Sequence, residues 1–202
     1  MTITYPLTAP SHAFARTKLR AITQVATSRS PFSLQTQVQD FGAQLWALEV
    51  TLSPMTRDEF EEWVCFLLML NGPKGTFLVG DSLARDPQGV ATGTPLVNGG
   101  SQTGNSLITD GWTGNTTNIL KAGDYLQIGN RLYKNLQDVN SDSGGNATLD
   151  IFPRLRESPA NNAGITLSNT IGTFRLPEID YELYTSDPFK IGGLSFTALE
   201  AI

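Results

Sequence analysis

A capped helix between two strand-like stretches, within residues 45–81, constrains the fold of this chain more than any other feature. Thr56 precedes Glu59 by three positions, the spacing of a capping box, in which hydroxyl and carboxylate each bind a free backbone N–H at a helix start. Apolar residues then recur at the spacing of one helical face, at Phe60, Trp63, Val64, Leu67 and Leu68. An Asn-Gly-Pro sequence at 71–73 closes the element. The pattern predicts one helix over residues 57–70.

The composition favours a mainly β chain around this helix. Only 16% of the 202 residues are charged, while 19 are Gly and 11 are Pro, a balance typical of many short strands and turns. The 40% share of hydrophobic residues is enough to form a core. The net charge of -5, with basic residues scattered along the chain, is a poor match for a surface that neutralises phosphates. We therefore expect no nucleic-acid sequence recognition.

The chain offers few residues for redox or metal chemistry. Its single cysteine, Cys65, falls in the apolar half of the helix and cannot form an internal disulfide. Its single histidine, His12, cannot build a multi-histidine metal site. The start lacks the pattern of a secretory signal, and the longest apolar run, residues 64–70, is too short to span a bilayer. We expect a soluble protein made in a reducing cytoplasm, with no metal, cofactor or membrane segment.

Alternating sequences before the helix predict strands. Residues 18–25 and 33–39 alternate as two half-buried strands, and residues 46–52 alternate as a third. Asp and Gly at 40–43 predict a turn into this third strand. Residues 1–17, which contain two prolines, predict an arm that wraps around the body or stays loose.

The sequence changes character after the helix. Residues 75–80 form a short apolar run bounded by glycines, which predicts a strand buried on both faces. Beyond it, twelve of the 19 glycines lie between positions 83 and 170, together with many Asn, Ser and Thr residues. Strand candidates in this region lie at 106–110, 125–128, 131–135 and 147–152. Their close spacing predicts a small antiparallel barrel or sandwich.

The C-terminal region shows the same alternating pattern of apolar residues as the first part of the chain. Alternating apolar residues from 171 onward, ending in a strand at 194–198, need a partner sheet, which the first part supplies. The predicted organisation is one discontinuous domain, residues 1–82 plus 171–202, that holds an inserted Gly-rich β module at 83–170.

Residues 45–81 also carry a resemblance to a known family. A strand ending in LEVTLSPM, a capped helix containing Glu-Glu-Trp, and a glycine turn into GTFLVGD together resemble the distal tail and minor tail (tail-tip) proteins of long-tailed bacteriophages. Residues 120–156, LKAGDYLQIGNRLYKNLQDVNSDSGGNATLDIFPRLR, look like the inserted β module of many tail-tip proteins of this kind.

The resemblance implies a fold, a function and partners. The fold would be a tail-tube-like β-sandwich or split barrel, with two sheets flanked by one helix and a small antiparallel β-barrel inserted. The protein would be a virion structural protein, assembled in the host cytoplasm, that forms a homohexamer ring and connects the tail tube to the tail-tip hub. Its partners would be further copies of itself, the tail tube protein, the hub and other minor tail proteins. Larger members carry a C-terminal sugar-binding domain, whereas here the additional module is internal.

The helix itself suggests a subunit contact. From residue 64 to 70 it is apolar all round, and Cys65, Phe66 and Met69 face away from the main stripe. One hypothesis makes these three residues an oligomer interface, and in that case Phe66→Asp should lose the oligomer and keep the β structure. The alternative is that the insertion or the N-terminal arm folds over this second face.

Two further functions compete with the structural role. Three aromatic residues in the insertion, Trp112, Tyr125 and Tyr133, could form a platform that stacks on sugars, although aromatic residues on short strands usually belong to a core. The alternative function is therefore a carbohydrate-binding module that recognises a host surface glycan. A tail-associated cell-wall hydrolase is the second alternative.

The acidic residues do not predict a catalytic pair. Those at 58, 59, 61 and 62 occupy the first turns of the helix, where the helix dipole favours negative charge, and Glu178, Asp180 and Glu182 alternate along one strand face. The Asp138-Asn140-Asp142 spacing is like the opening of a calcium loop, but Leu149 stands where the closing Glu should be, which favours a hairpin turn. We expect no enzyme.

Overall fold

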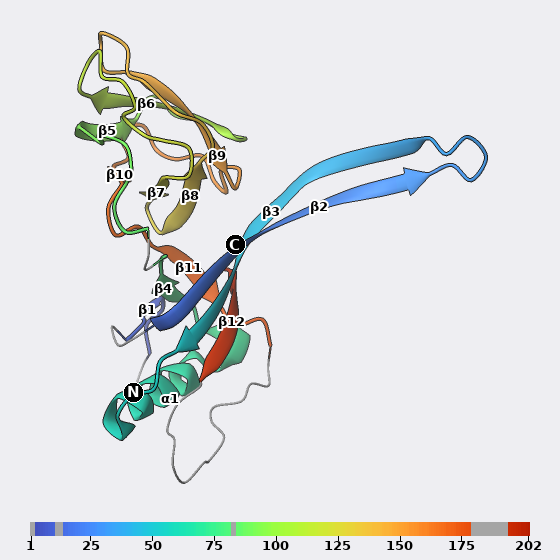
Figure 1. Cartoon of the computed structure of the whole chain (residues 1–202), viewed down its shortest axis with the longest axis vertical. Helices are drawn as coiled ribbons and strands as arrows, with labels where there is room; N and C mark the ends of the chain where they lie inside the picture. Colours follow the sequence, from blue (N-terminus) through green and yellow to red (C-terminus); the bar gives the residue numbers. More distant parts are fainter. Residues whose placement is uncertain (1–2, 11–13, 82–83, 179–193) are drawn as a thin grey trace.

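The structure, a computed structural model, describes residues 3–10, 14–81, 84–178 and 194–202. These residues form a mainly β chain with one α-helix, as the composition predicts. His12, Asp180, Glu182 and the strand expected near 179–183 lie outside the described residues. Two six-stranded sheets make up the described body (Figure 1).

The first sheet is built from both ends of the chain. Its neighbouring strands are, in order, β1 (Leu7–Thr8), β4 (Phe77–Val79), β11 (Gly172–Arg175), β12 (Ser195–Glu200), β3 (Thr36–Leu52) and β2 (Phe14–Arg29). The β1–β4 pair is parallel, and all other pairs are antiparallel. The terminal strand β12 lies between β11 and β3, so the end of the chain completes a sheet that the N-terminal part begins.

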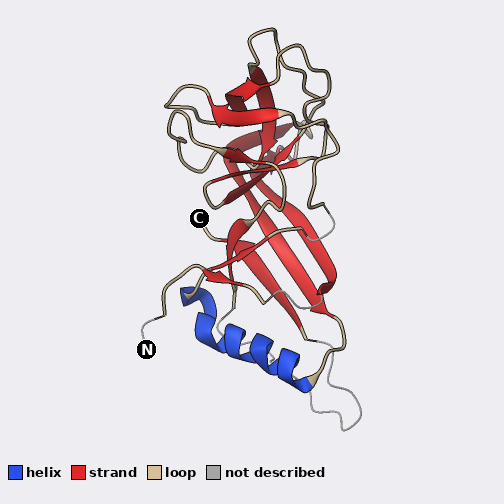
Figure 2. Ribbon diagram, turned by 90° about the vertical axis from the view of Figure 1, so that its left-hand side faces the viewer, coloured by secondary structure: helices blue, strands red, loops and turns tan. Residues whose placement is uncertain are grey.

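Helix α1 (Arg57–Leu70) covers one face of this sheet (Figure 2). The expected capping box is confirmed, because the Thr56 side chain accepts from the Glu59 N–H and the Glu59 carboxylate accepts from the Thr56 N–H at 2.9 Å. Asn71, with φ 54°, ends the helix in the left-handed conformation, and the 3₁₀ turn η1 (Gly72–Lys74) follows. The buried helix residues are Phe60, Trp63, Val64, Phe66, Leu67 and Leu70.

The second sheet forms the nearly closed, barrel-like module that was expected. Its order is β10 (Ile165–Thr166), β7 (Tyr125–Ile128), β8 (Arg131–Asn135), β9 (Ala147–Phe152), β6 (Ser106–Trp112) and β5 (Gly93–Val97). The predicted bounds of β7, β8 and β9 are confirmed, β6 is two residues longer than expected, and β5 and β10 were not predicted. Val97 donates to the Ala163 carbonyl and accepts from the Asn162 N–H, both at 2.9 Å. These bonds join the two edges of the sheet.

The two sheets draw on separate parts of the sequence. Strands of the first lie within residues 7–79 and 172–200, and those of the second within 93–166. The two apolar cores nevertheless meet, because Tyr125 and Leu132 of the second sheet belong to the core of the first. That the two parts are independent domains stays a prediction.

Trp46 lies at the junction between the two sheets. Its indole N–H donates to the Leu132 carbonyl at 3.0 Å, and its ring packs edge-on against Phe152 at 4.9 Å between centroids. Its backbone N–H donates to Glu200 at 3.0 Å, and the same carboxylate accepts two hydrogen bonds from Arg156, at 3.0 and 2.6 Å. Both charged side chains are buried. A two-bond, buried ion pair therefore connects the insertion to the terminal strand.

Strand β3 corrects the expected turn at residues 40–43. The chain runs through this stretch as one strand, and the register shifts from the Gln24–Ala43 pair to the Val25–Asp40 pair. Two residues of β3 are thus left over in a bulge, where Gly42 has φ +68° and its N–H donates to the Asp40 side chain at 2.6 Å. An Asp-x-Gly sequence suits a turn and a bulge equally well, because both need a left-handed residue and a local side-chain acceptor. The chain reverses instead at 30–35.

Two smaller expectations also change. Residues 75–80 do not form a strand buried on both faces, because Leu78 in β4 is only half-buried. The N-terminal stretch is more regular than expected, since Leu7 and Thr8 pair with β4 and β2 already begins at Phe14. It therefore contributes an edge to the first sheet.

The junction ion pair should be sensitive to the loss of one partner. Arg156→Met leaves the Glu200 carboxylate buried without its cation, and we expect the free energy of unfolding to fall by about 3–5 kcal/mol. Arg156→Met with Glu200→Met removes both charges and leaves only the Trp46 N–H unsatisfied, at a cost of about 1–3 kcal/mol. Urea unfolding of both variants measures the difference. Equal losses in the single and double variants would contradict this assignment.

Candidate functional site

The β2–β3 hairpin extends far beyond the sheet to which it belongs (Figure 1). We call residues 23–41 the arm. All of them are exposed except Ser30, which is half-buried. The neighbouring strand β12 pairs with β3 only at residues 47–51, so past the bulge β2 and β3 pair with each other alone among the described strands. The arm is about 25 Å long, at ~3.3 Å per residue from the bulge to the tip.

Local hydrogen bonds shape the tip of the arm. The Ser30 hydroxyl accepts from the Phe32 and Ser33 N–H groups, both at 3.3 Å, and the Ser30 carbonyl accepts from the Leu34 N–H at 3.0 Å. Leu34 has φ 58°, a left-handed conformation that is uncommon for a residue other than Gly. The resulting loop presents Phe32, 97% exposed, and Leu34, 60% exposed. Burying these two side chains would contribute roughly 1.5–3 kcal/mol each.

The two faces of the arm differ in chemistry. Directly opposite residues share a face of an antiparallel ladder. One face carries the β-branched residues Val25, Thr27, Thr36 and Val38 together with both charged residues of the arm, Arg29 and Asp40. The other carries the small and amide residues Ala26, Ser28, Gln37 and Gln39.

The arm has few of the features that usually keep a strand edge from pairing with other chains. Its only charged residues are Arg29 and Asp40, and its strand segments contain no Lys and no Pro. An isolated two-stranded hairpin is marginally stable in water at best. A sparsely charged ribbon with two open edges and an apolar tip is therefore suited to pairing with another chain.

Sequence reasoning missed the arm because alternation shows only that a strand has two different faces. Residues 18–25 and 33–39 alternate, and we expected them to be half-buried. A signal was present: between Thr23 and Phe41 the larger apolar residues are a minority, and Gln, Thr and Ser take most of the other positions. Such a composition cannot cover a core on either face.

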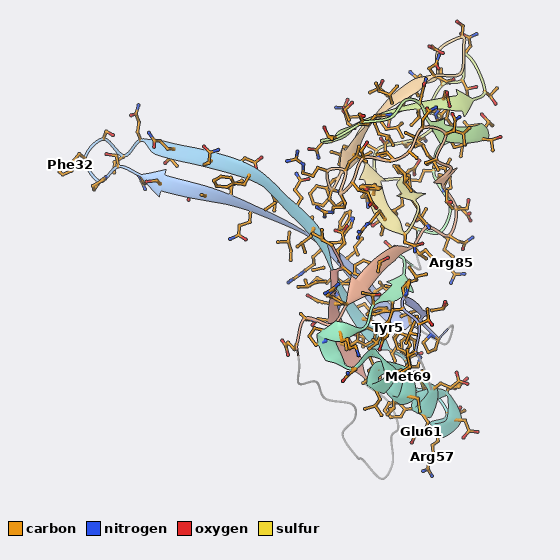
Figure 3. The ribbon with its side chains drawn as sticks, turned by 180° about the vertical axis from the view of Figure 1, so that it is seen from behind. Tyr5, Phe32, Arg57, Glu61, Met69 and Arg85 are labelled. Carbon is orange, nitrogen blue, oxygen red and sulfur yellow. The ribbon has the colours of Figure 1, made fainter. Side chains whose placement is uncertain are left out.

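The outer face of α1 is a second candidate surface. Its first half is acidic, with Asp58, Glu61 and Glu62 exposed. Its second half carries three exposed apolar side chains, which we call the helix patch: Cys65, Leu68 (55% exposed) and Met69 (41% exposed). The N-terminal segment lies beside this end of the helix, since the Tyr5 hydroxyl donates to the Met69 carbonyl at 2.7 Å (Figure 3). The N-terminal segment thus reaches the helix without burying the patch.

Phe66 does not belong to this outer face, contrary to the expectation from sequence. It is 3% exposed, and its ring packs edge-on against Trp63 at 5.6 Å and against Phe77 at 5.5 Å. Strand β4 comes alongside the helix at this position and turns a peripheral residue into a core residue. Of the three residues proposed for an interface, Cys65 and Met69 are exposed and Phe66 is not, while Leu68 is exposed and was assigned to the core stripe. Phe66→Asp would therefore disrupt the core rather than test assembly.

The prediction that three aromatic residues form an exposed sugar-stacking platform is wrong. Trp112, Tyr125 and Tyr133 are all buried. The Trp112 indole N–H donates to the Thr109 hydroxyl at 2.8 Å, and the Tyr125 hydroxyl donates to Asp81 at 3.4 Å. Burial, together with the Asp81 carboxylate, raises the pKa of Tyr125. These aromatic residues serve the two cores and their junction.

The acidic residues singled out in the sequence have structural partners. Asp138 accepts from the Ala122 N–H at 2.8 Å, Asn140 accepts from the Asn118 N–H at 2.7 Å, and Asp142 accepts from the Gly144 N–H at 2.8 Å. Asp138 and Asn140 thus bind the loop between β6 and β7, and Asp142 binds its own loop, as in the turn interpretation. These backbone bonds lower the pKa of Asp142, with the Asn146 N–H the largest contributor. Within the described residues there is no group of three or more His, Cys, Asp or Glu that could hold a metal ion.

A cavity of about 380 Å³ lies on the open side of the first sheet. Hydroxyl groups of Thr51, Ser195 and Thr197 line it, together with the carboxylates of Glu49 and Glu178. Glu49 forms ion pairs with Lys18 at 3.2 Å and with Arg20 at 3.3 Å. Glu49 is thus engaged by two cations at the edge of this cavity.

No protein-family model matches the chain, and no curated protein matches it in sequence. None of the helices within the described ranges is long and apolar enough to cross a membrane.

The different positions of Phe66 and Leu68 predict different effects on stability. Phe66→Ala removes a ring from the core, and we expect the free energy of unfolding to fall by about 3–5 kcal/mol. Leu68→Ala changes an exposed position on the same helix and should stay within about 0.5 kcal/mol of the parent. Urea unfolding at a protein concentration that keeps the chain monomeric measures both. Similar losses for the two variants would show that Phe66 lies outside the core.

Proposed function

We propose that this chain is a virion structural protein of a phage tail tip, whose copies assemble into a ring that connects the tail tube to the tail-tip hub. The observation that carries the proposal is the arm: an exposed β-hairpin with only two charged residues, open edges and the apolar side chains of Phe32 and Leu34 at its tip. The resemblance of residues 45–81 to tail-tip proteins supports it, and so does the mainly β fold with one helix.

The arm supports self-assembly on physical grounds. Two strand edges supply rows of backbone N–H and C=O groups, and a partner strand that pairs with them adds hydrogen bonds without any specific side-chain chemistry. A contact between unlike surfaces of identical copies generates a ring when the rotation between copies closes, and a filament when it does not. The role proposed here is mechanical, and no catalytic group takes part. Six copies per ring, and the tail tube and hub as partners, follow from the resemblance.

The proposal can be tested with a truncated arm. Gln24 and Ala43 are directly paired, so residues 25–42 can be replaced by an Asn-Gly turn that joins them as a short hairpin. The full chain should run as an oligomer in size-exclusion chromatography with light scattering, and negative-stain images should show rings with a central hole. The truncated variant should be monomeric, with an unchanged near-UV circular dichroism signal from the core aromatic residues.

Two results would count against the proposal. If the full chain remains monomeric at every concentration tested, it does not assemble through its own surfaces. If the truncated variant forms an oligomer of the same size, then another surface drives assembly.

A further inference from the structure

Exposed large apolar side chains gather on two surfaces of the described body. Five of them belong to the arm: Val25, Phe32, Leu34, Val38 and Phe41. Two more, Leu68 and Met69, lie next to each other in the helix patch, beside the exposed Cys65. The other exposed large apolar residues are scattered singly over the N-terminal segment, the second sheet and the C-terminus, and single exposed apolar residues are ordinary.

The arm tip cannot contact the helix patch of its own chain. Phe32 lies at the far end of the arm, well away from Met69, and the arm points away from the helix (Figure 3). The root of the arm sets this direction: Gly42 in the bulge has φ +68°, and a Cβ at this position would collide with the Arg154 guanidinium. The backbone N–H of Arg154 donates to the Gln44 side chain at 2.8 Å, and this bond holds Arg154 in place. Contact between the two surfaces therefore requires a second copy.

The two surfaces are complementary in charge as well as in polarity. Arg29 is the one cationic residue of the arm, and it lies next to the tip loop. On the helix, Glu61 and Glu62 lie one turn before Cys65 and are exposed, and Glu61 also forms an ion pair with Arg57 at 4.0 Å. An arm tip on the helix patch would place a guanidinium within reach of these carboxylates while Phe32 covers the apolar side chains.

We propose that the arm tip of one copy, Phe32 and Leu34, docks on the helix patch of the next copy, Cys65, Leu68 and Met69. This inference rests on the proposed self-assembly and names the two surfaces that meet. The contact is head-to-tail, because each copy offers one arm and one patch at separate places. It can therefore continue from copy to copy until a ring closes.

The single native cysteine provides a direct test. Ser33→Cys introduces a second thiol at the exposed arm tip and keeps Phe32 and Leu34, while Cys65 marks the patch. A short bis-maleimide linker, which tolerates looser geometry than a disulfide, joins the two thiols if they are close. Denaturing gels should show a ladder of cross-linked species from dimer upward. Adding Phe32→Ser should lower the cross-linking yield by about tenfold or more.

Matched controls separate this contact from the alternatives. Ser33→Cys with Cys65→Ser should give no cross-link, whereas a dimer that persists in this variant means that arms pair with each other, and the inference is wrong. Ser143→Cys puts the second thiol in an exposed loop of the second sheet and should give no ladder; a ladder there would mean unspecific reaction and would overturn the assignment.

Light scattering on the same samples distinguishes failure of the inference from failure of the proposed function. An oligomer without a cross-link ladder overturns the arm-to-helix contact and leaves self-assembly standing. A monomer without a ladder overturns both.

Charge reversal adds a specific readout: Arg29→Glu should lower the cross-linking yield, and Glu62→Lys should restore it. A yield that does not respond to either change would contradict the charge pairing.

Discussion

The buried contact of Trp46, Glu200 and Arg156 is the interaction on which the arrangement of the two sheets depends. Glu200 lies at the end of the chain, Arg156 just after the last long strand of the second sheet, and Trp46 in the strand that becomes the arm. Desolvating two charges is costly, and the cost is offset here because both carboxylate oxygens accept from Arg156, through Nε and Nη2, and one of them also accepts from the Trp46 N–H. The two hydrogen bonds of this ion pair form only when Arg156 and Glu200 have one relative position, so the pair favours one orientation of the second sheet on the first.

That orientation also determines where the arm points. Gln44, two residues before Trp46, accepts from the Arg154 N–H and from the Asn105 side chain, so the second sheet holds the strand at the point where the arm leaves the body. The bulge at Gly42 lies directly beyond this contact. A contact between copies can close a ring only if each subunit holds a constant angle to the next. A rigid root combined with an exposed tip meets this requirement better than a loose tail would.

The helix shows how one element can serve both stability and recognition. Its buried stripe packs Trp63 and Phe66 against the sheet, while its outer face is acidic near the start and apolar near the end. The acidic half suits the positive end of the helix dipole, so it needs no partner to explain it. The apolar half has no such explanation among the described residues of one copy. The helix dipole therefore accounts for the acidic half of the outer face, whereas the apolar half is suited to contact with a neighbouring copy.

Local chemistry determined much of this fold from sequence alone. Thr56, Glu59 and Asn71 set the helix ends, because caps act over three or four residues, and the Gly129-Asn130 turn set the β7–β8 hairpin for the same reason. Burial was decided only by the tertiary structure. Phe66 became core because β4 lies beside it, and the arm became exposed because β12 ends before reaching it. Alternation and helical spacing show which residues share a face, whereas the element that covers that face comes from elsewhere in the chain or from another copy.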